Sequence, residues 1–293
     1  MEIIKGYTYM HEHMYIDLSK VKQDSDCTFD ATDEIILELK ECYALGLRNI
    51  VEVSNRGMGR DIAIIERIER ETKLNIIKST GYYKVPFLPE EFNLLSEEEL
   101  ADIMVDEITK EINNGVKACV IGEIGTSNNT WEDEEIKLFN AAVIAHKKTN
   151  APIYTHTTLG TLAISQADYF IKQGVDPKKV IIGHIDLSKD LNVIIDVLDK
   201  GFYVGFDTVG KNNYFPDEQR IDFLIEIEKR GQINQVMLSQ DLTRKSHLEV
   251  NGGIGYAYLL KTFIPMAIEK GLSKESIDTM LIENPQRFFK DYE

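Results

Sequence analysis

Two histidines near the amino terminus are spaced so that they could bind a metal ion. The stretch YTYMHEHMYIDLS, residues 7–19, places His11 and His13 on either side of Glu12 in a chain that has six histidines. In an extended strand, residues two apart point to the same face, so both imidazoles would aim at one point while Glu12 faces away. Imidazole nitrogens are common zinc ligands, and the triplet therefore predicts part of a metal site.

Short apolar, β-branched runs recur along the whole chain and predict strands. Most are continuously apolar, which is typical of parallel strands that are buried on both faces. The eight candidate strands are GYTYMH, RNIVEVS, LNIIKST, KACVIGEIG, APIYTHT, KVIIGHID, GFYVGFDT and NQVMLSQD, beginning at residues 6, 48, 74, 117, 151, 179, 201 and 234.

Amphipathic segments with helical periodicity lie between these runs, for example residues 32–46, 59–73, 96–115 and 216–231. Strands that alternate with helices over this length are typical of an α/β fold of the (β/α)8, or TIM barrel, type. A doubly wound open sheet is the rival architecture. We find no linker or break in composition, so residues 1–293 are expected to form a single domain.

Composition narrows the class of protein. The net charge of −16 argues against binding to nucleic acid and against a polybasic membrane anchor. No apolar run reaches the roughly 20 residues of a membrane helix, and the start of the chain lacks the features of a signal peptide. The three cysteines show no Cys-x-x-Cys spacing, which fits a reducing compartment. We therefore expect a cytoplasmic protein that acts on a small molecule, with neither nucleic acid nor membrane as partner.

Polar residues stand at the carboxyl ends of several predicted strands, where TIM barrels carry their active sites. Any one of them could be a hydrogen-bonded structural residue, but barrel closure would bring them all to one mouth. Burying so many ionisable groups without a cation would be costly, so the set predicts a metal site. Its members are His11, His13, Glu123, His156, His184 and Asp241.

Six ligands are too many for one tetrahedral zinc ion but suit two ions that share a carboxylate. The natural division assigns His11, His13 and Asp241 to one ion, and His156 and His184 to the other. Glu123 would bridge the two, and a shared hydroxide would complete each shell. Zinc is the expected metal, while manganese, cobalt and iron also accept histidine and carboxylate ligands.

The motifs around these residues resemble a known family. MHEHM, GEIGTS, YTHTTLG, IIGHIDL and SQDLTRKSH, in this order along the chain, are similar to those of the phosphotriesterase family of the amidohydrolase superfamily. The likeness is strongest to its phosphotriesterase homology protein branch and covers essentially the whole chain. It implies a binuclear metal-dependent hydrolase and suggests a homodimer.

One position departs from better-known members of that family, which bridge their metals with a carboxylated lysine. This chain has Glu123 there, in CVIGEIGTS. A carbamate and a glutamate both present an O–C–O group that can span two cations. Glu123 therefore predicts that metal reconstitution needs no bicarbonate.

A hydroxide held between two such ions is a nucleophile near neutral pH, because the cations lower the pKa of bound water. Asp241 would accept the hydroxide proton and return it to the leaving group, which makes it the candidate catalytic residue. The expected reaction is hydrolysis of an ester or a lactone, with a phosphoester as an alternative.

Three further residues are candidates for substrate binding. Lys211 and Arg244 follow the seventh and eighth strands, whose loops often bind phosphate in TIM barrels. They favour an anionic substrate, for example a phosphorylated sugar lactone, although each could instead pair with one of the many acidic residues. Tyr82 or Tyr83, after the third strand, could donate to a developing oxyanion, and Tyr83 is the candidate that we select; the alternative is packing.

Two other functions remain open from the sequence. A mononuclear deaminase of the same superfamily shares the histidines and the final aspartate but lacks a bridging acid on the fourth strand, so metal stoichiometry separates the two. A metal-binding protein without turnover would also keep the ligands.

Overall fold

The computed structural model describes residues 3–113 and 115–290. Its central sheet has eight parallel strands in the order of the chain, so each strand pairs with the one before it. The strands are β1 (Tyr7–Glu12), β4 (Leu47–Glu52), β5 (Asn75–Thr80), β6 (Val120–Thr126), β7 (Ile153–Thr157), β8 (Val180–Gly183), β9 (Tyr203–Phe206) and β10 (Val236–Leu238). Each of the eight coincides with one of the runs predicted from the sequence, and β1, β4 and β6 extend one residue beyond theirs.

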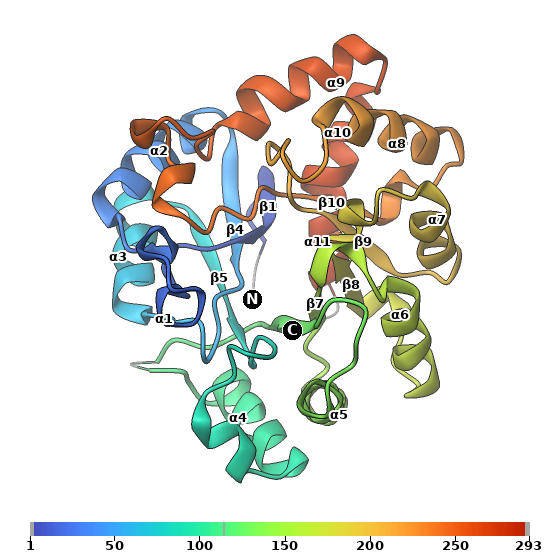
Figure 1. Cartoon of the computed structure of the whole chain (residues 1–293). Helices are drawn as coiled ribbons and strands as arrows, with labels where there is room; N and C mark the ends of the chain where they lie inside the picture. The colour runs from blue at the N-terminus through green and yellow to red at the C-terminus, as the bar shows by residue number, and fades with distance from the viewer. Residues whose placement is uncertain (1–2, 114, 291–293) are drawn as a thin grey trace.

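The sheet curls into a nearly closed barrel surrounded by helices (Figure 1). The first and last strands meet through side chains: the His11 amide donates to Ser239 Oγ over 3.0 Å. The carboxylate of Glu12 accepts from Ser239 Oγ and from the amides of Gln240 and Leu242. The Glu12 carboxylate therefore connects β1 by hydrogen bonds to the segment that follows β10. The predicted single-domain TIM barrel is thus the fold of the described residues.

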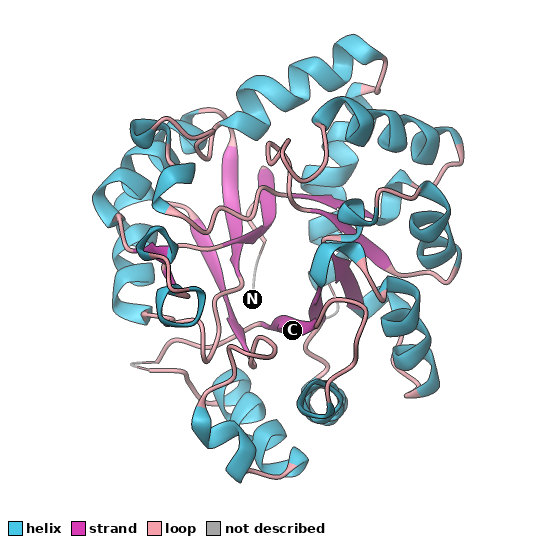
Figure 2. Ribbon diagram, in the orientation of Figure 1, coloured by secondary structure: helices cyan, strands magenta, loops and turns pink. Residues whose placement is uncertain are grey.

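The helices cover the outside of the barrel, as Figure 2 shows in cyan. They are α2 (Thr32–Ala44), α3 (Ile62–Thr72), α4 (Glu97–Thr109), α5 (Asp133–Thr149), α6 (Ala163–Lys172), α7 (Leu191–Asp199), α8 (Asp217–Lys229), α9 (Ile264–Lys270), α10 (Lys274–Asp278) and α11 (Asn284–Phe289). Single π-helical segments precede α9 and α11, at Leu259–Phe263 and Thr279–Glu283. The loop after β1 holds α1 (Ser19–Lys22) and the antiparallel pair β2 (Ile16–Asp17) and β3 (Thr28–Phe29).

Local sequence explains where several helices begin. Ser96 and Glu99 form a reciprocal capping box at α4, and Asp61 accepts from the Ile64 amide at α3. The helix predicted to reach residue 115 ends earlier, at Thr109, because the chain turns back between Asn113 and Val116. None of the described helices is long and apolar enough to cross a membrane.

The core has two parts. One fills the barrel interior and includes Met10, Val51, Ile77, Val120, Tyr154, Ile181, Tyr203 and Met237, one residue from each strand. Phe288 and Phe289 of α11 pack against this layer. The other part lies between the strands and the surrounding helices. The interior is therefore packed with apolar side chains, and the polar residues of the next section lie beyond this layer at the carboxyl ends of the strands.

Candidate metal centre and active site

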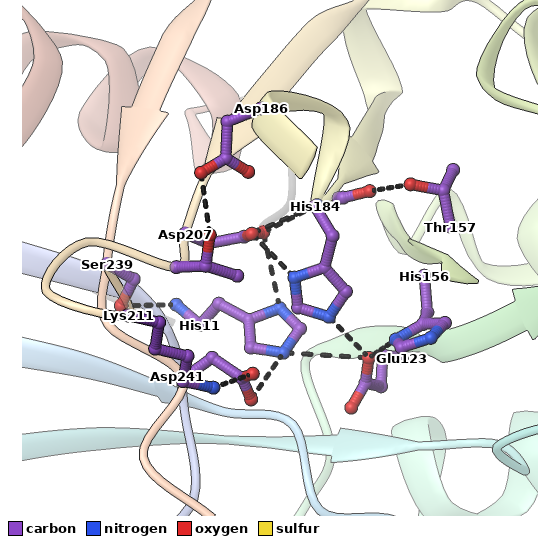
Figure 3. A network of polar contacts seen from close by, with 12 residues as sticks. His11, Glu123, His156, Thr157, His184, Asp186, Asp207, Lys211, Ser239 and Asp241 are labelled. Atoms are coloured by element: carbon purple, nitrogen blue, oxygen red, sulfur yellow. Dashed lines mark hydrogen bonds and ion pairs between the residues drawn. The ribbon is translucent and has the colours of Figure 1, made fainter. Parts of the chain in front are cut away.

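The six predicted ligands meet at the carboxyl ends of the strands. His11 lies on β1, Glu123 on β6 and His156 on β7, while His13, His184 and Asp241 follow β1, β8 and β10. Figure 3 shows five of these side chains converging, together with Lys211 and Asp207. The structure therefore brings together residues that are up to 230 positions apart in the sequence, counted from His11 to Asp241.

The histidine pair of β1 has the predicted geometry. The rings of His11 and His13 lie edge to face with centroids 5.6 Å apart, and both side chains are buried. Glu12 points the other way, toward the segment after β10. His13 Nδ1 lies 2.8 Å from Ser54 Oγ, which leaves Nε2 to face the cluster.

Glu123 reaches the centre because β6 contains an irregularity. Val120 points into the barrel, so regular alternation would turn Ile124 inward and Glu123 outward. The register with β7 shifts between Ile121 and Ile124, and Ile124 packs in the outer core instead. Bulges of this kind re-aim side chains beside active sites. The shift brings the Glu123 carboxylate within 2.9 Å of His156 Nδ1 and 3.5 Å of His184 Nε2.

Alternation does position the ligand on β7. Tyr154 points into the barrel, and His156, two residues later, faces the same interior. Asp241 lies three residues after the end of β10 and has a left-handed backbone, with φ of 53°. His184 follows the last residue of β8 and has a left-handed backbone, with φ of 54°.

These residues fit a metal centre because buried ring nitrogens lack hydrogen-bond partners. Both nitrogens of His11 and Nε2 of His13 are buried without one among the described residues. His13 Nε2 lies 3.2 Å from Asp241 Oδ1, and His11 Nε2 lies 3.6 Å from both Asp241 Oδ1 and Glu123 Oε2. Unpaired buried polar atoms are costly, and coordination to a cation would satisfy them.

Two groups of donor atoms are close enough to hold one ion each: His11, His13 and Asp241, and His11, Glu123 and His184. The first is the predicted set for one ion. The second includes His11 in place of His156, which instead contacts the Glu123 carboxylate. The two groups share His11 and so form one continuous cluster of possible metal ligands.

The carboxylates of the cluster stay ionised. Burial raises the pKa of Glu123, but His11 and His156 outweigh it and hold this pKa well below its ordinary value. Burial also raises the pKa of Asp241, while the Lys211 ammonium and His13 lower it well below the usual range. Lys211 forms a short ion pair with Asp241 Oδ2. Asp241 thus faces the histidines with one oxygen and Lys211 with the other.

A cavity of about 290 Å³ opens above the cluster. Tyr83 lines it and places its hydroxyl 3.3 Å from His156 Nε2, whereas Tyr82 is buried against Phe92. Lys211 and Arg244 also line the cavity. The Arg244 guanidinium, however, is 2.7 Å from Asp24 and 3.6 Å from Asp26, which is the salt-bridged alternative considered above.

Sequence reasoning missed Asp207, at the end of β9. Its carboxylate accepts from His184 Nδ1 over 2.6 Å, from the His184 amide and from Tyr154 Oη. A carboxylate behind a ligating histidine fixes the ring's orientation and tautomer. Gly205 makes room for it, because a Cβ there would lie 2.3 Å from Asp207 Oδ2. The position of Asp207, after the apolar run FYVGF, is the same signal that identified the other strand-end residues.

Comparison with known proteins settles the family. The model of the phosphotriesterase family matches residues 3–289. The chain belongs to the phosphotriesterase family. One relative is the phosphotriesterase homology protein of Escherichia coli, which is 46% identical over 97% of this chain and 98% of its own length. The crystal structure of that protein, complexed with phosphate in its active site, superposes on this chain with a TM-score of 0.96. The match covers 98% of this chain and 100% of the chain in that crystal structure.

Other members of the phosphotriesterase family show the range of activities found on this fold. A lactonase from Listeria monocytogenes has a TM-score of 0.91 and 25% identity, covering 97% of this chain and 94% of its own. An N-acetyltaurine hydrolase from Dictyostelium discoideum is 30% identical over 86% of this chain and 71% of its own length. These relatives are hydrolases, and the family membership makes this chain a hydrolase.

Proposed function

We propose that this chain is a binuclear metal-dependent hydrolase that cleaves an ester or lactone of a small anionic molecule, with a phosphorylated sugar lactone as the specific candidate. The observation that carries the proposal is the buried cluster of four histidines, Glu123 and Asp241 beneath a cavity. His11, His13 and Asp241 would hold one ion, and His156 and His184 the other, with Glu123 between them. Zinc remains the metal predicted from these ligands.

Two divalent ions, when bound, would supply a nucleophilic hydroxide from water at neutral pH and polarise the scissile C=O bond. Asp241 would accept the proton of the nucleophile, because it is ionised and one of its oxygens faces the cluster. Lys211 keeps this carboxylate oriented through its ion pair. The proton would then pass to the leaving group.

Tyr83 would act on the other side of the cavity. Burial raises the pKa of its phenol well above the ordinary value, so the hydroxyl remains protonated and able to donate. A neutral donor at this position would stabilise the oxygen on which negative charge develops. This role keeps Tyr83 distinct from Tyr82, whose hydroxyl is buried away from the cavity.

A second candidate reaction is hydrolysis of an amide that carries an anionic group. The relative named N-acetyltaurine hydrolase supports it, because an acetylated amine is attacked at the same kind of carbonyl carbon as an ester. The phosphate in the active site of the Escherichia coli relative supports an anionic ligand in both cases. The homodimer and the cytoplasmic location expected from the sequence stay part of this proposal.

The test is a substrate panel on protein whose metal content has been measured. The panel contains lactones, carboxylic esters, N-acyl amines, phosphomonoesters and phosphotriesters. We expect two metal equivalents per chain and turnover of a lactone, ester or amide, with Asp241→Asn as the inactive control. One equivalent together with deamination would favour the deaminase, and two equivalents without any turnover would favour a metal-binding protein.

A further inference from the structure

Lys84 is a buried cation beside the histidine cluster that has no ion-pair partner among the described residues. It is 9% exposed and lines the cavity. It forms no ion pair with any residue in the described part of the chain, and its ammonium donates to the Val85 carbonyl over 3.0 Å. Burial lowers the pKa of Lys84, as expected when a charge is held away from water.

The other basic residues of the cavity differ from Lys84. Lys211 is paired with Asp241, and Arg244 with Asp24 and Asp26. Lys22 is exposed at the rim, where water solvates its charge. Lys84 alone among these four cavity-lining cations is both buried and free of a carboxylate partner.

Glu135 and Glu123 attract the Lys84 ammonium, but neither forms an ion pair with it in the described part of the chain. Glu135 is held by the amide and hydroxyl of Ser127 and by the amide of Glu132. Glu123 is the carboxylate that would lie between the two ions. Burying an ammonium group without an ion-pair partner costs free energy, and an anion bound from solution would offset that free energy.

The surroundings hold Lys84 in place over the cavity. Its Nζ lies 5.6 Å from the ring centroids of both Tyr83 and Phe87. Its stem passes over Gly125, where a Cβ would lie 3.0 Å from Lys84 Cδ and 3.2 Å from His156 Cβ. Gly125 therefore keeps open the space that lets Lys84 lie directly beside a predicted metal ligand.

We propose that Lys84 binds an oxyanion group of the substrate, a carboxylate, sulfonate or phosphate, while the scissile bond lies over the histidine cluster. The proposal rests on the hydrolase function above and assigns specificity to the loop after β5 instead of to Arg244. The cavity of about 290 Å³ lies near the lower end of the size of ligand pockets, so the anionic group is close to the bond that is cleaved.

The experiment compares matched substrates with and without the anionic group. One pair is a phosphorylated sugar lactone and its dephospho form, and the other is N-acetyltaurine and N-ethylacetamide. Lys84→Met removes the charge but keeps an apolar stem, Lys84→Arg restores the charge, and Lys22→Met is the control at the exposed rim. Melting temperatures of all variants establish that each one folds.

We expect Lys84→Met to lower kcat/KM for the anionic member of a pair by about 30-fold or more, mainly through KM, with the neutral member changed less than about twofold. Lys84→Arg should recover part of the loss, and Lys22→Met should cost less than about threefold. The pair that shows the loss identifies the type of anion. Equal losses for both members, or no loss for either, would overturn the role of Lys84.

A binding measurement separates this proposal from the hydrolase function. Inorganic phosphate and ethanesulfonate are titrated calorimetrically into the metal-loaded and metal-free proteins. If the panel shows no turnover, the proposed function fails, but a loss of binding in Lys84→Met would still support an anion site. Binding that is absent in the wild-type protein, or unchanged in Lys84→Met, would contradict the site itself.

Discussion

Replacing Asp207 by asparagine tests whether the carboxylate behind His184 tunes the metal centre. Asp207 Oδ1 accepts from Nδ1 and the amide of His184, at 2.6 and 2.9 Å, while Oδ2 accepts from Tyr154 Oη at 2.8 Å. Asparagine can keep the two Oδ1 contacts. Its Nδ2 can donate to Tyr154 Oη, because a hydroxyl is also an acceptor. The substitution therefore removes the charge and little of the hydrogen bonding.

The expected magnitude follows from that geometry. Loss of such a partner typically weakens metal affinity by about 10–100-fold. Because the contacts survive, Asp207→Asn should fall at the low end, about 10-fold or about 1.4 kcal/mol at one of the two ion positions. Asp207→Ala loses the contacts as well and should approach about 100-fold.

Competition with a chromophoric chelator measures these affinities, and Tyr154→Phe is the matched control. It removes one bond to Asp207 but leaves the His184 pair intact, so its affinity should change by less than about threefold. An Asp207→Asn protein that binds both ions as tightly as the wild type would refute the reasoning that Asp207 orients a ligand.

Further predictions concern stability and reconstitution. Glu12→Gln should cost about 1–3 kcal/mol in chemical denaturation, because the carboxylate accepts three buried hydrogen bonds that join β1 to the segment after β10; an unchanged midpoint would contradict this. Burial raises the pKa of Glu107, but the ion pair with Arg60 outweighs burial, and the pKa is lowered from its ordinary value of 4.5. The pair should therefore stabilise the fold fully at pH values above 4.5 and lose this effect as the pH falls through the lowered pKa. Glu107→Gln should therefore flatten the acid side of the stability curve, and parallel curves would be evidence against the pair. Reconstitution of the apo-protein with metal should be insensitive to added bicarbonate, because Glu123 needs no carboxylation, and activity that rises steeply with bicarbonate would exclude this. Metal removal should lower stability by about 2.7 kcal/mol for each ion, relative to protein at a free metal concentration 100 times Kd, and an unchanged melting temperature would argue against binding to the folded state.

The fold was predictable because its signals are local and repeated. Each strand is a short apolar run, and Ser96 and Asp61 cap helices at positions that sequence alone identifies. The position of Glu123 on the fourth strand of the barrel was equally visible. Its inward orientation was not, because it depends on a register shift between β6 and β7.

Pairing between distant side chains was harder to predict. Nothing in the sequence around Arg244 indicates that Asp24 and Asp26, more than 200 residues away, hold its guanidinium. Lys84 shows the converse, because its lack of an ion-pair partner among the described residues becomes visible once the packing around it is known. Sequence therefore predicted which residues gather at the mouth, while the structure was needed to tell which charges are already paired.

The most direct test is anomalous diffraction from crystals of the metal-loaded protein, measured at the absorption edge of the bound metal. The account predicts two peaks, with Glu123 within bonding distance of both and His11, His13 and Asp241 around one of them. A single peak, or two peaks of which Glu123 contacts at most one, would contradict the shared-carboxylate centre on which the proposed hydrolysis depends.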